Sequence, residues 1–256
     1  MKKTILTRKE LAILEKIISE LGYIAYVEYI NKLLARDYSE QEIRRQISLL
    51  SKRGWLVRIK RGVFAVANLE SHSFANLSPL MVSQILSPSS YVSFEFALAE
   101  YGLFDQLPKK LTAVTLGKPR KFVFQGMEYE FRKIKPDLYF GFEETTVNDG
   151  KVNVAELEKA ILDFLYFRID TYSIDLVLEK LKESRKELNL AKLYNYTAKY
   201  PMSVKRRLGF LLDLTDTPTD ELLKAIGSRR DFSKLTNTSD IFNAKWRIYY
   251  ENRFTE

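Results

Sequence analysis

The sequence predicts an α+β protein with two parts, a small N-terminal module over residues 1–68 and a larger α+β domain over residues 77–256. Three observations predict this fold class. Helical periodicity follows two helix-start signals near the N-terminus, a strand–turn–strand segment comes next, and a long region then places strands before helices. Hydrophobic residues make up 46% of the 256 residues, which is enough to bury a core.

Two capping boxes of the pattern S/T-x-x-E mark the starts of helices in the N-terminal module, one at Thr7 and one at Ser39. Apolar residues at helical spacing follow each box. Gly22 and Gly54 stand where these two helices are expected to end. A shorter apolar pattern over residues 27–34 predicts a middle helix, so the module holds three helices.

A β-hairpin is predicted directly after the third helix. Two strand-like runs, residues 56–59 and 63–66, flank the segment Lys60-Arg61-Gly62. Gly62 can supply the positive φ that a tight turn requires. Three helices followed by a hairpin with a basic tip are typical of a winged helix-turn-helix.

Positive charge is concentrated in this module. Residues 1–66 contain 14 Lys and Arg against 7 Asp and Glu, whereas the remainder contains 27 against 26. This asymmetry favours a polyanion-binding module joined to a nearly neutral domain. The alternative is a solvated basic helix in a winged helix that binds protein.

The third predicted helix has a polar face that is suited to the major groove of duplex DNA, which would be the partner. Arginine can pair with guanine through two hydrogen bonds and glutamine with adenine, while basic residues of the hairpin contact phosphates. The predicted DNA-binding residues are Ser39, Gln41, Arg44, Arg45, Ser48, Lys52, Arg58, Lys60 and Arg61.

The larger domain is predicted to follow a polar linker at residues 68–76. Short helices are expected near residues 80–86 and 94–101. An antiparallel sheet is expected between residues 111 and 154, and a strand near 246–250. Helices are predicted over residues 155–168, 173–186, 189–200 and 203–214. Basic clusters at 118–121, 205–207 and 229–230 are interpreted as solvated faces, or as extensions of a nucleic-acid footprint.

Composition excludes several kinds of site. The absence of cysteine excludes disulfides, thiol nucleophiles and cysteine zinc sites, and the single His72 is expected in the linker or on the surface. We therefore expect no metal and no cofactor. The N-terminus lacks the apolar stretch of a signal peptide, and no segment has the 18 apolar residues of a membrane span. We expect a soluble cytoplasmic protein without a membrane partner.

One pattern suggests an enzyme. Pro136-Asp137 with Asp149-Gly150-Lys151 resembles the PD…D/E-x-K arrangement of magnesium-dependent nucleases, in which two carboxylates hold the ion. In a chain with 29% charged residues this spacing arises easily by chance, and Asp149-Gly150 also suits a hairpin turn. A nuclease is therefore an alternative, and no enzymatic activity is expected.

Residues 49–65 resemble the helix-to-wing segment of AbiEi-type antitoxins, which belong to bacterial abortive-infection systems. Residues 91–98, 113–117, 154–163 and 207–212 are also similar to segments of that family, so the resemblance covers most of residues 39–215. It implies a repressor of its own operon that binds inverted repeats in the promoter. It also implies a C-terminal domain that counters a nucleotidyltransferase toxin during phage defence. Because some family members occur without a toxin, a stand-alone transcriptional regulator is the alternative.

Overall fold

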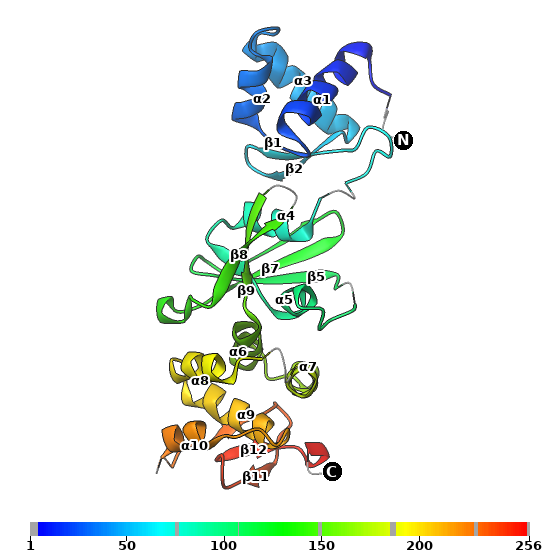
Figure 1. The fold of residues 1–256 in the computed structure, drawn as a ribbon. Helices are drawn as coiled ribbons and strands as arrows, with labels where there is room; N and C mark the ends of the chain where they lie inside the picture. The colour runs from blue at the N-terminus through cyan, green and yellow to red at the C-terminus, as the bar shows by residue number, and fades with distance from the viewer. Residues whose placement is uncertain are drawn as a thin grey trace. The chain divides into compact units, whose positions relative to one another are not determined.

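The chain has a mixed α+β fold, as the sequence predicts (Figure 1). The computed structural model describes residues 5–74, 77–106, 108–147, 150–184, 188–227 and 230–254. The chain divides into two compact units. The first consists of Met1–Pro88, Val123–Met127 and Thr146–Lys151, and the second of Ser89–Phe122, Glu128–Thr145 and Val152–Glu256.

Three helices and a three-stranded sheet form the N-terminal part of the first unit. The helices are α1 (Arg8–Leu21), α2 (Val27–Leu34) and α3 (Glu40–Arg53). The strands are β1 (Ile24–Tyr26), β2 (Leu56–Lys60) and β3 (Val63–Val66), in the order β1-β3-β2 with antiparallel pairing. The Arg61-Gly62 turn joins β2 to β3, and Gly62 has the positive φ of 79° that this turn requires.

The two predicted capping boxes differ in the structure. At Thr7 the box is complete, because its hydroxyl accepts from the Glu10 amide and the Glu10 carboxylate accepts from the Thr7 amide. At Ser39 only half of it forms. The Ser39 hydroxyl accepts from the Glu42 amide, but the Glu42 carboxylate binds other side chains. Gly54, in the left-handed conformation, ends α3 as predicted.

Residues 68–74 of the predicted linker 68–76 are folded as part of the first unit, and residues 75–76 lie outside the described residues. Leu69 and Phe74 pack on the apolar core formed by the three helices and the sheet. The Asn68 side chain accepts hydrogen bonds from two following backbone amides, and the His72 ring lies 4.1 Å from the Trp55 ring, measured between centroids. His72 therefore has a packing role. The next helix, α4 (Pro79–Leu86), also lies in the first unit.

The largest sheet has six strands in the order β6-β7-β5-β4-β9-β8. Its strands are β4 (Ser90–Val92), β5 (Lys110–Thr115), β6 (Arg120–Phe124), β7 (Met127–Lys133), β8 (Phe142–Val147) and β9 (Gly150–Ala155). The prediction of an antiparallel sheet is wrong in part. β4 pairs with β5 antiparallel, but β5 pairs with β7 and β4 with β9 in parallel. β5 and β7 are parallel because β6, which lies between them in the sequence, occupies the edge of the sheet beyond β7. The chain therefore passes β5 on its way to β6 and returns in β7 beside β5, running in the same direction as β5.

Helices dominate the rest of the second unit. α5 (Phe94–Glu100) follows β4, and the 3-10 helix η1 (Pro136–Leu138) follows β7. The four long helices predicted after the sheet are present as α6 (Leu157–Phe167), α7 (Thr171–Glu183), α8 (Leu190–Ala198) and α9 (Met202–Asp213). The sequence did not predict α10 (Asp220–Ile226), which spans only seven residues.

A small sheet completes the second unit, where the sequence predicted a single strand. It consists of β10 (Ser233–Lys234), β11 (Ile241–Asn243) and β12 (Ile248–Tyr250) in the order β10-β12-β11, and the 3-10 helix η2 (Asn252–Phe254) follows. Trp246 packs so closely on α9 that a Cβ at Gly209 would lie 2.0 Å from its ring. This contact requires glycine at position 209 and anchors the small sheet on α9.

Glu251 stabilises the end of this small sheet. Its carboxylate accepts hydrogen bonds from the hydroxyls of Thr236 and Thr238 and forms an ion pair with Arg253. Burial alone would raise the pKa of Glu251, but these hydrogen bonds and the nearby guanidinium lower it to about 2. Within the described segments of the chain, no helix has the length and hydropathy needed to cross a membrane.

Candidate nucleic-acid interface

The exposed face of α3 carries five of the residues predicted to bind DNA. Gln41, Arg44, Arg45, Ser48 and Lys52 are exposed and follow one another at the three- and four-residue steps that share one helix face. On the opposite face Ile43, Gln46 and Leu50 are buried. This division follows from the apolar spacing in the sequence. Ser39, the residue before the helix, is also exposed and accepts from the Glu42 amide at 3.3 Å.

Both arginines of this face are paired with carboxylates of the same helix. Arg44 lies 2.5 Å from Glu40, and Arg45 donates to both oxygens of Glu42 at 2.9 and 3.0 Å. The Arg44 and Glu40 side chains are 72% and 69% exposed. Exposed pairs of this kind contribute only about 0.2–1 kcal/mol. The Arg44 guanidinium can therefore exchange its carboxylate for another acceptor at small cost.

Glu42 has more partners than Glu40. Hydrogen bonds from Arg45, Lys9 and Gln46 hold the pKa of the Glu42 carboxyl well below its usual range. Lys9 belongs to α1 and Gln46 is buried, so Glu42 also ties α3 to α1. These carboxylates were not among the predicted site residues. The four-residue spacing of Glu40 and Arg44 is the signal that could have identified one pair.

A groove of about 500 Å³ separates α3 from the β2–β3 hairpin. Its polar walls are Arg44, Ser48, Ser51 and Arg58, and Ile47 and Phe64 form part of its apolar lining. The Arg58 guanidinium lies 5.6 Å from the centroid of the Phe64 ring. The structure thus brings three of the predicted residues, Arg44, Ser48 and Arg58, to one groove.

Ser51 is a member of this groove that the sequence did not indicate. Its hydroxyl oxygen is buried and has no hydrogen-bond partner among the residues that the structure describes. A buried hydroxyl without a partner is uncommon in folded proteins. No sequence pattern marks this residue, because serine near a helix end usually caps or is solvated.

The two basic residues at the hairpin tip have different surroundings. Arg61 is exposed in the turn. The Lys60 ammonium donates to the backbone carbonyl of Ile85, at the C-terminal end of α4, where the helix dipole favours a cation. Burial lowers the pKa of Lys60. Arg61 is therefore available to a polyanion, whereas Lys60 is already engaged within the first unit.

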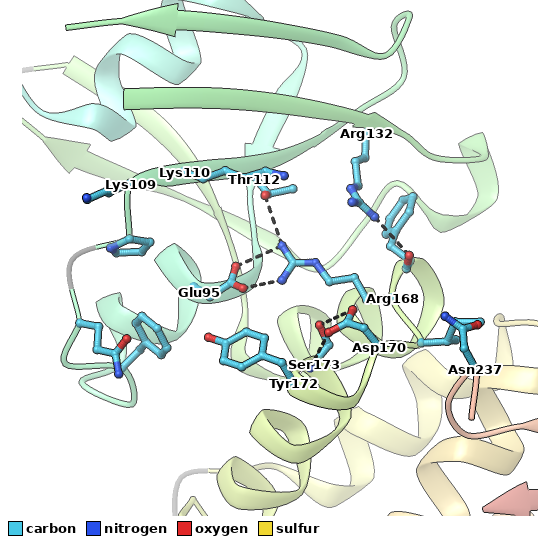
Figure 2. Close-up of a pocket in the computed structure, with 15 residues that line it drawn as sticks. Glu95, Lys109, Lys110, Thr112, Arg132, Arg168, Asp170, Tyr172, Ser173 and Asn237 are labelled. Atoms are coloured by element: carbon cyan, nitrogen blue, oxygen red, sulfur yellow. Dashed lines mark hydrogen bonds and ion pairs between the residues drawn. The ribbon is translucent and has the colours of Figure 1, made fainter. Parts of the chain in front are cut away.

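A separate cavity of about 500 Å³ lies in the second unit (Figure 2). Arg168 forms an ion pair with Glu95 on its floor, donates to the Thr112 hydroxyl at 3.3 Å, and lies over the Phe94 ring at 4.3 Å from the centroid. Arg132 donates to the carbonyl of Phe167 at 3.1 Å. The Arg168 guanidinium and the Glu95 carboxylate thus satisfy one another within the cavity wall, whereas the buried Nε of Arg132 has no hydrogen-bond partner among the described residues.

Asp170 and Ser173 lie at the side of the same cavity. The Asp170 carboxylate accepts from both the amide and the hydroxyl of Ser173 at 2.9 Å. This is the geometry of a helix N-cap, here at the start of α7, rather than of a serine activated for attack. Asp170 and Ser173 are therefore engaged with each other at the start of α7.

A buried polar cluster lies in the second unit around Asp163. Its carboxylate accepts from Ser93 at 2.8 Å, Tyr91 at 3.0 Å, Tyr200 at 3.1 Å and Lys159 at 2.5 Å. Neither Lys159 nor Asp163 is exposed to solvent. Burial lowers the pKa of Lys159, although the Asp163 charge opposes that shift. The mutual satisfaction of these groups indicates a structural role.

The residues of the nuclease hypothesis are distributed as follows. Asp137 is exposed in η1, and Lys151 is exposed on β9. Asp149 lies outside the described residues. The parts of the chain that the structure describes contain no group of three or more histidine, aspartate or glutamate side chains that could hold a metal ion.

No family model and no curated protein matches this chain. Among solved structures, the chain is similar to the crystal structure of the RV2827C protein from Mycobacterium tuberculosis, with a TM-score of 0.69 and 12% sequence identity. The alignment covers 96% of this chain and 92% of that chain. At this identity the similarity shows a shared fold over nearly the whole length of both chains.

Proposed function

We propose that this chain is a transcriptional repressor that binds duplex DNA through a winged helix-turn-helix made by α1–α3 and the β2–β3 hairpin. The observation that carries the proposal is the exposed polar face of α3, where Arg44 and Arg45 are exposed and Arg44 lines the same groove as Arg58. The excess of 14 basic over 7 acidic residues in residues 1–66 gives this unit the charge that a polyanion partner requires.

In this proposal α3 enters the major groove and its N-terminal half reads bases. Gln41 suits adenine, and Arg44 and Arg45 suit guanine through paired hydrogen bonds. Arg44 exchanges the exposed Glu40 carboxylate for a base edge, and Arg45 exchanges the half-buried Glu42 carboxylate, which keeps Lys9 and Gln46 as partners. Arg61 contacts a backbone phosphate from the hairpin, and Lys52 contacts one from the last turn of the helix.

The wider role that we propose is that of an antitoxin in an abortive-infection toxin–antitoxin system. The resemblance of residues 49–65 and 154–163 to AbiEi-type antitoxins supports this role. The first unit would bind inverted repeats in the promoter of its own operon, and the second unit would counter a nucleotidyltransferase toxin. A stand-alone regulator without a toxin is the alternative.

Fluorescence anisotropy with a labelled duplex from the promoter upstream of the gene tests DNA binding. Arg44→Ala and Arg45→Ala should each weaken binding by roughly 1–3 kcal/mol, about 5- to 150-fold in Kd, if each arginine pairs with a base through two hydrogen bonds. Lys16→Ala is a matched control, because Lys16 is a partly exposed cation of α1 in the same unit. If both arginine variants bind as tightly as the wild type, the assigned surface is wrong.

Co-expression with a nucleotidyltransferase toxin, taken from the operon of this gene if one is encoded there, tests the antitoxin role. The wild type should restore growth that the toxin arrests. The doubly substituted Arg44→Ala, Arg45→Ala chain should restore growth equally well while failing to repress a promoter reporter, because the proposed activities lie in different units. A wild type that represses the reporter but never restores growth would favour the stand-alone regulator.

A further inference from the structure

The small C-terminal sheet exposes a group of aromatic side chains. Phe232, just before β10, is 59% exposed, and Phe242 of β11 is 43% exposed. Both rings lie against the ring of Tyr249 of β12, each at a centroid distance of 5.2 Å. We call Phe232, Phe242 and Tyr249 the aromatic patch. Contiguous exposed aromatic rings on a folded protein commonly mark an interaction site.

Strand alternation explains why the patch faces outward. Phe242 and Tyr249 are directly opposite each other across the antiparallel β11–β12 pair, so their side chains share one face of the sheet. The neighbours of Tyr249 point to the other face, where Ile248 is buried and the Tyr250 ring lies 5.0 Å from the Phe210 ring of α9. The core of the second unit is therefore filled from that face, and the patch is not required to complete it.

Cationic side chains adjoin the patch. Lys234 is exposed and pairs with Tyr249 in the parallel β10–β12 register, so it extends the row that Tyr249 and Phe242 form across the sheet. The Arg247 guanidinium lies 5.9 Å from the centroid of the Phe242 ring. It is held there by hydrogen bonds to the backbone carbonyls of residues 230 and 231.

Acidic groups near the patch are mostly engaged elsewhere. The Asp231 carboxylate forms an ion pair with Arg206 at 3.0 Å, and the Glu251 carboxylate with Arg253. Lys234 has no ion-pair partner among the described residues, whereas Asp240, just before β11, is an exposed carboxylate. The two cations Lys234 and Arg247 outnumber the Asp240 carboxylate beside the rings, and this positive excess is complementary to a phosphate backbone.

We propose that the aromatic patch binds single-stranded RNA. Unpaired bases stack on the exposed rings of Phe232 and Phe242, which pack against Tyr249, while Lys234 and Arg247 lie beside the phosphates. Aromatic rings on a sheet with flanking cations have the chemistry that binds unpaired bases, whose faces a duplex hides within its stack. RNA loops and ends present such bases in their ordinary state. This surface is thus distinct from α3, which we assign to duplex DNA.

Binding of the full-length chain to a fluorescein-labelled 12-nucleotide RNA without secondary structure tests the proposal, with single-stranded DNA of the same sequence and the promoter duplex as further arms. Phe232→Ala and Phe242→Ala should each weaken RNA binding about 5- to 150-fold, as expected for the loss of one stacked base. Tyr172→Ala is a matched control, because Tyr172 is another exposed aromatic of the second unit. Phe242→Trp should retain binding, since it keeps an aromatic face.

Comparing the three nucleic acids separates this proposal from the proposal that α3 binds duplex DNA. The phenylalanine variants should bind the promoter duplex as the wild type does, and the Arg44→Ala variant should keep its affinity for RNA. The proposal is overturned if the wild type does not bind the RNA, if it binds single-stranded DNA more tightly, or if the phenylalanine variants bind RNA normally. Loss of self-association in these variants, without any RNA binding, would instead assign the patch to a contact between copies of the chain.

Discussion

Removal of the Asp163 carboxylate should destabilise the second unit more than the substitution of any exposed residue does. In the Asp163→Ala variant the buried Lys159 ammonium loses its counter-ion, and the hydroxyls of Tyr91, Ser93 and Tyr200 lose a shared acceptor. Breaking a fully buried ion pair from one side costs about 3–5 kcal/mol, because the remaining charge stays desolvated. We expect a loss of at least this size in the free energy of unfolding.

A double-mutant cycle separates the charge from the hydrogen bonds. Lys159→Met removes the cation, and the combined Lys159→Met, Asp163→Ala variant leaves only neutral hydroxyls in the cluster. The double variant should therefore lose less stability than the sum of the two single losses, by about 1–3 kcal/mol, as is usual for groups in direct contact.

The two tryptophans allow this loss to be assigned to one unit. Trp55 lies in the first unit and Trp246 in the second, where it is buried and donates to Asp213. Urea unfolding followed by fluorescence in a Trp55→Phe background therefore reports the second unit. A loss below about 1 kcal/mol for Asp163→Ala, or strict additivity in the cycle, would refute the reasoning that the cluster is a coupled buried pair.

Three further predictions concern charged side chains, two of them in the first unit and one in the small C-terminal sheet. Glu40→Gln should tighten promoter binding about 1.4- to 5-fold by anisotropy, because Arg44 no longer exchanges an exposed partner worth about 0.2–1 kcal/mol. Arg61→Ala should reduce the slope of log K against log salt by about 1, whereas Lys60→Ala should reduce it less, since its ammonium is bound to a backbone carbonyl. Glu251 has a folded-state pKa of about 2 against 4.5 when unperturbed, so its stabilisation is present above about pH 4.5 and is lost as the pH falls toward 2. Acid unfolding of the Glu251→Gln variant should accordingly depend less on pH in that window.

Local signals in the sequence were sufficient to predict most helices and strands of the first unit. Ser39 and Gly54 mark the ends of α3 because capping and the left-handed stop depend on the residues themselves. β1 was not predicted, since a three-residue strand has no measurable alternation and forms by pairing with β3. The segment at residues 68–74 consists mostly of polar residues, yet its Leu69 and Phe74 side chains pack against the apolar core.

The other features of the fold depend on contacts between residues far apart in the sequence, so the sequence alone could not predict them. Apolar alternation predicts a strand but not its direction, so the parallel pairing of β5 with β7 could not be foreseen. The exposed face of α3 follows from helical spacing. The contact of Lys60 with the Ile85 carbonyl joins residues 25 positions apart and has no local signal. Likewise, Phe242 and Tyr249 have the spacing of core residues, and only the sheet decides which face they occupy.

Site-specific photo-crosslinking tests most directly whether α3 enters the DNA. A photoreactive residue at Gln41, on the exposed face of α3, should crosslink to the promoter duplex. The same residue at Glu20, exposed near the end of α1, should not, since that helix packs behind α3 in a winged helix-turn-helix. A chain that binds the duplex yet crosslinks at Glu20 and not at Gln41 would contradict the assignment of α3 as the DNA-reading helix.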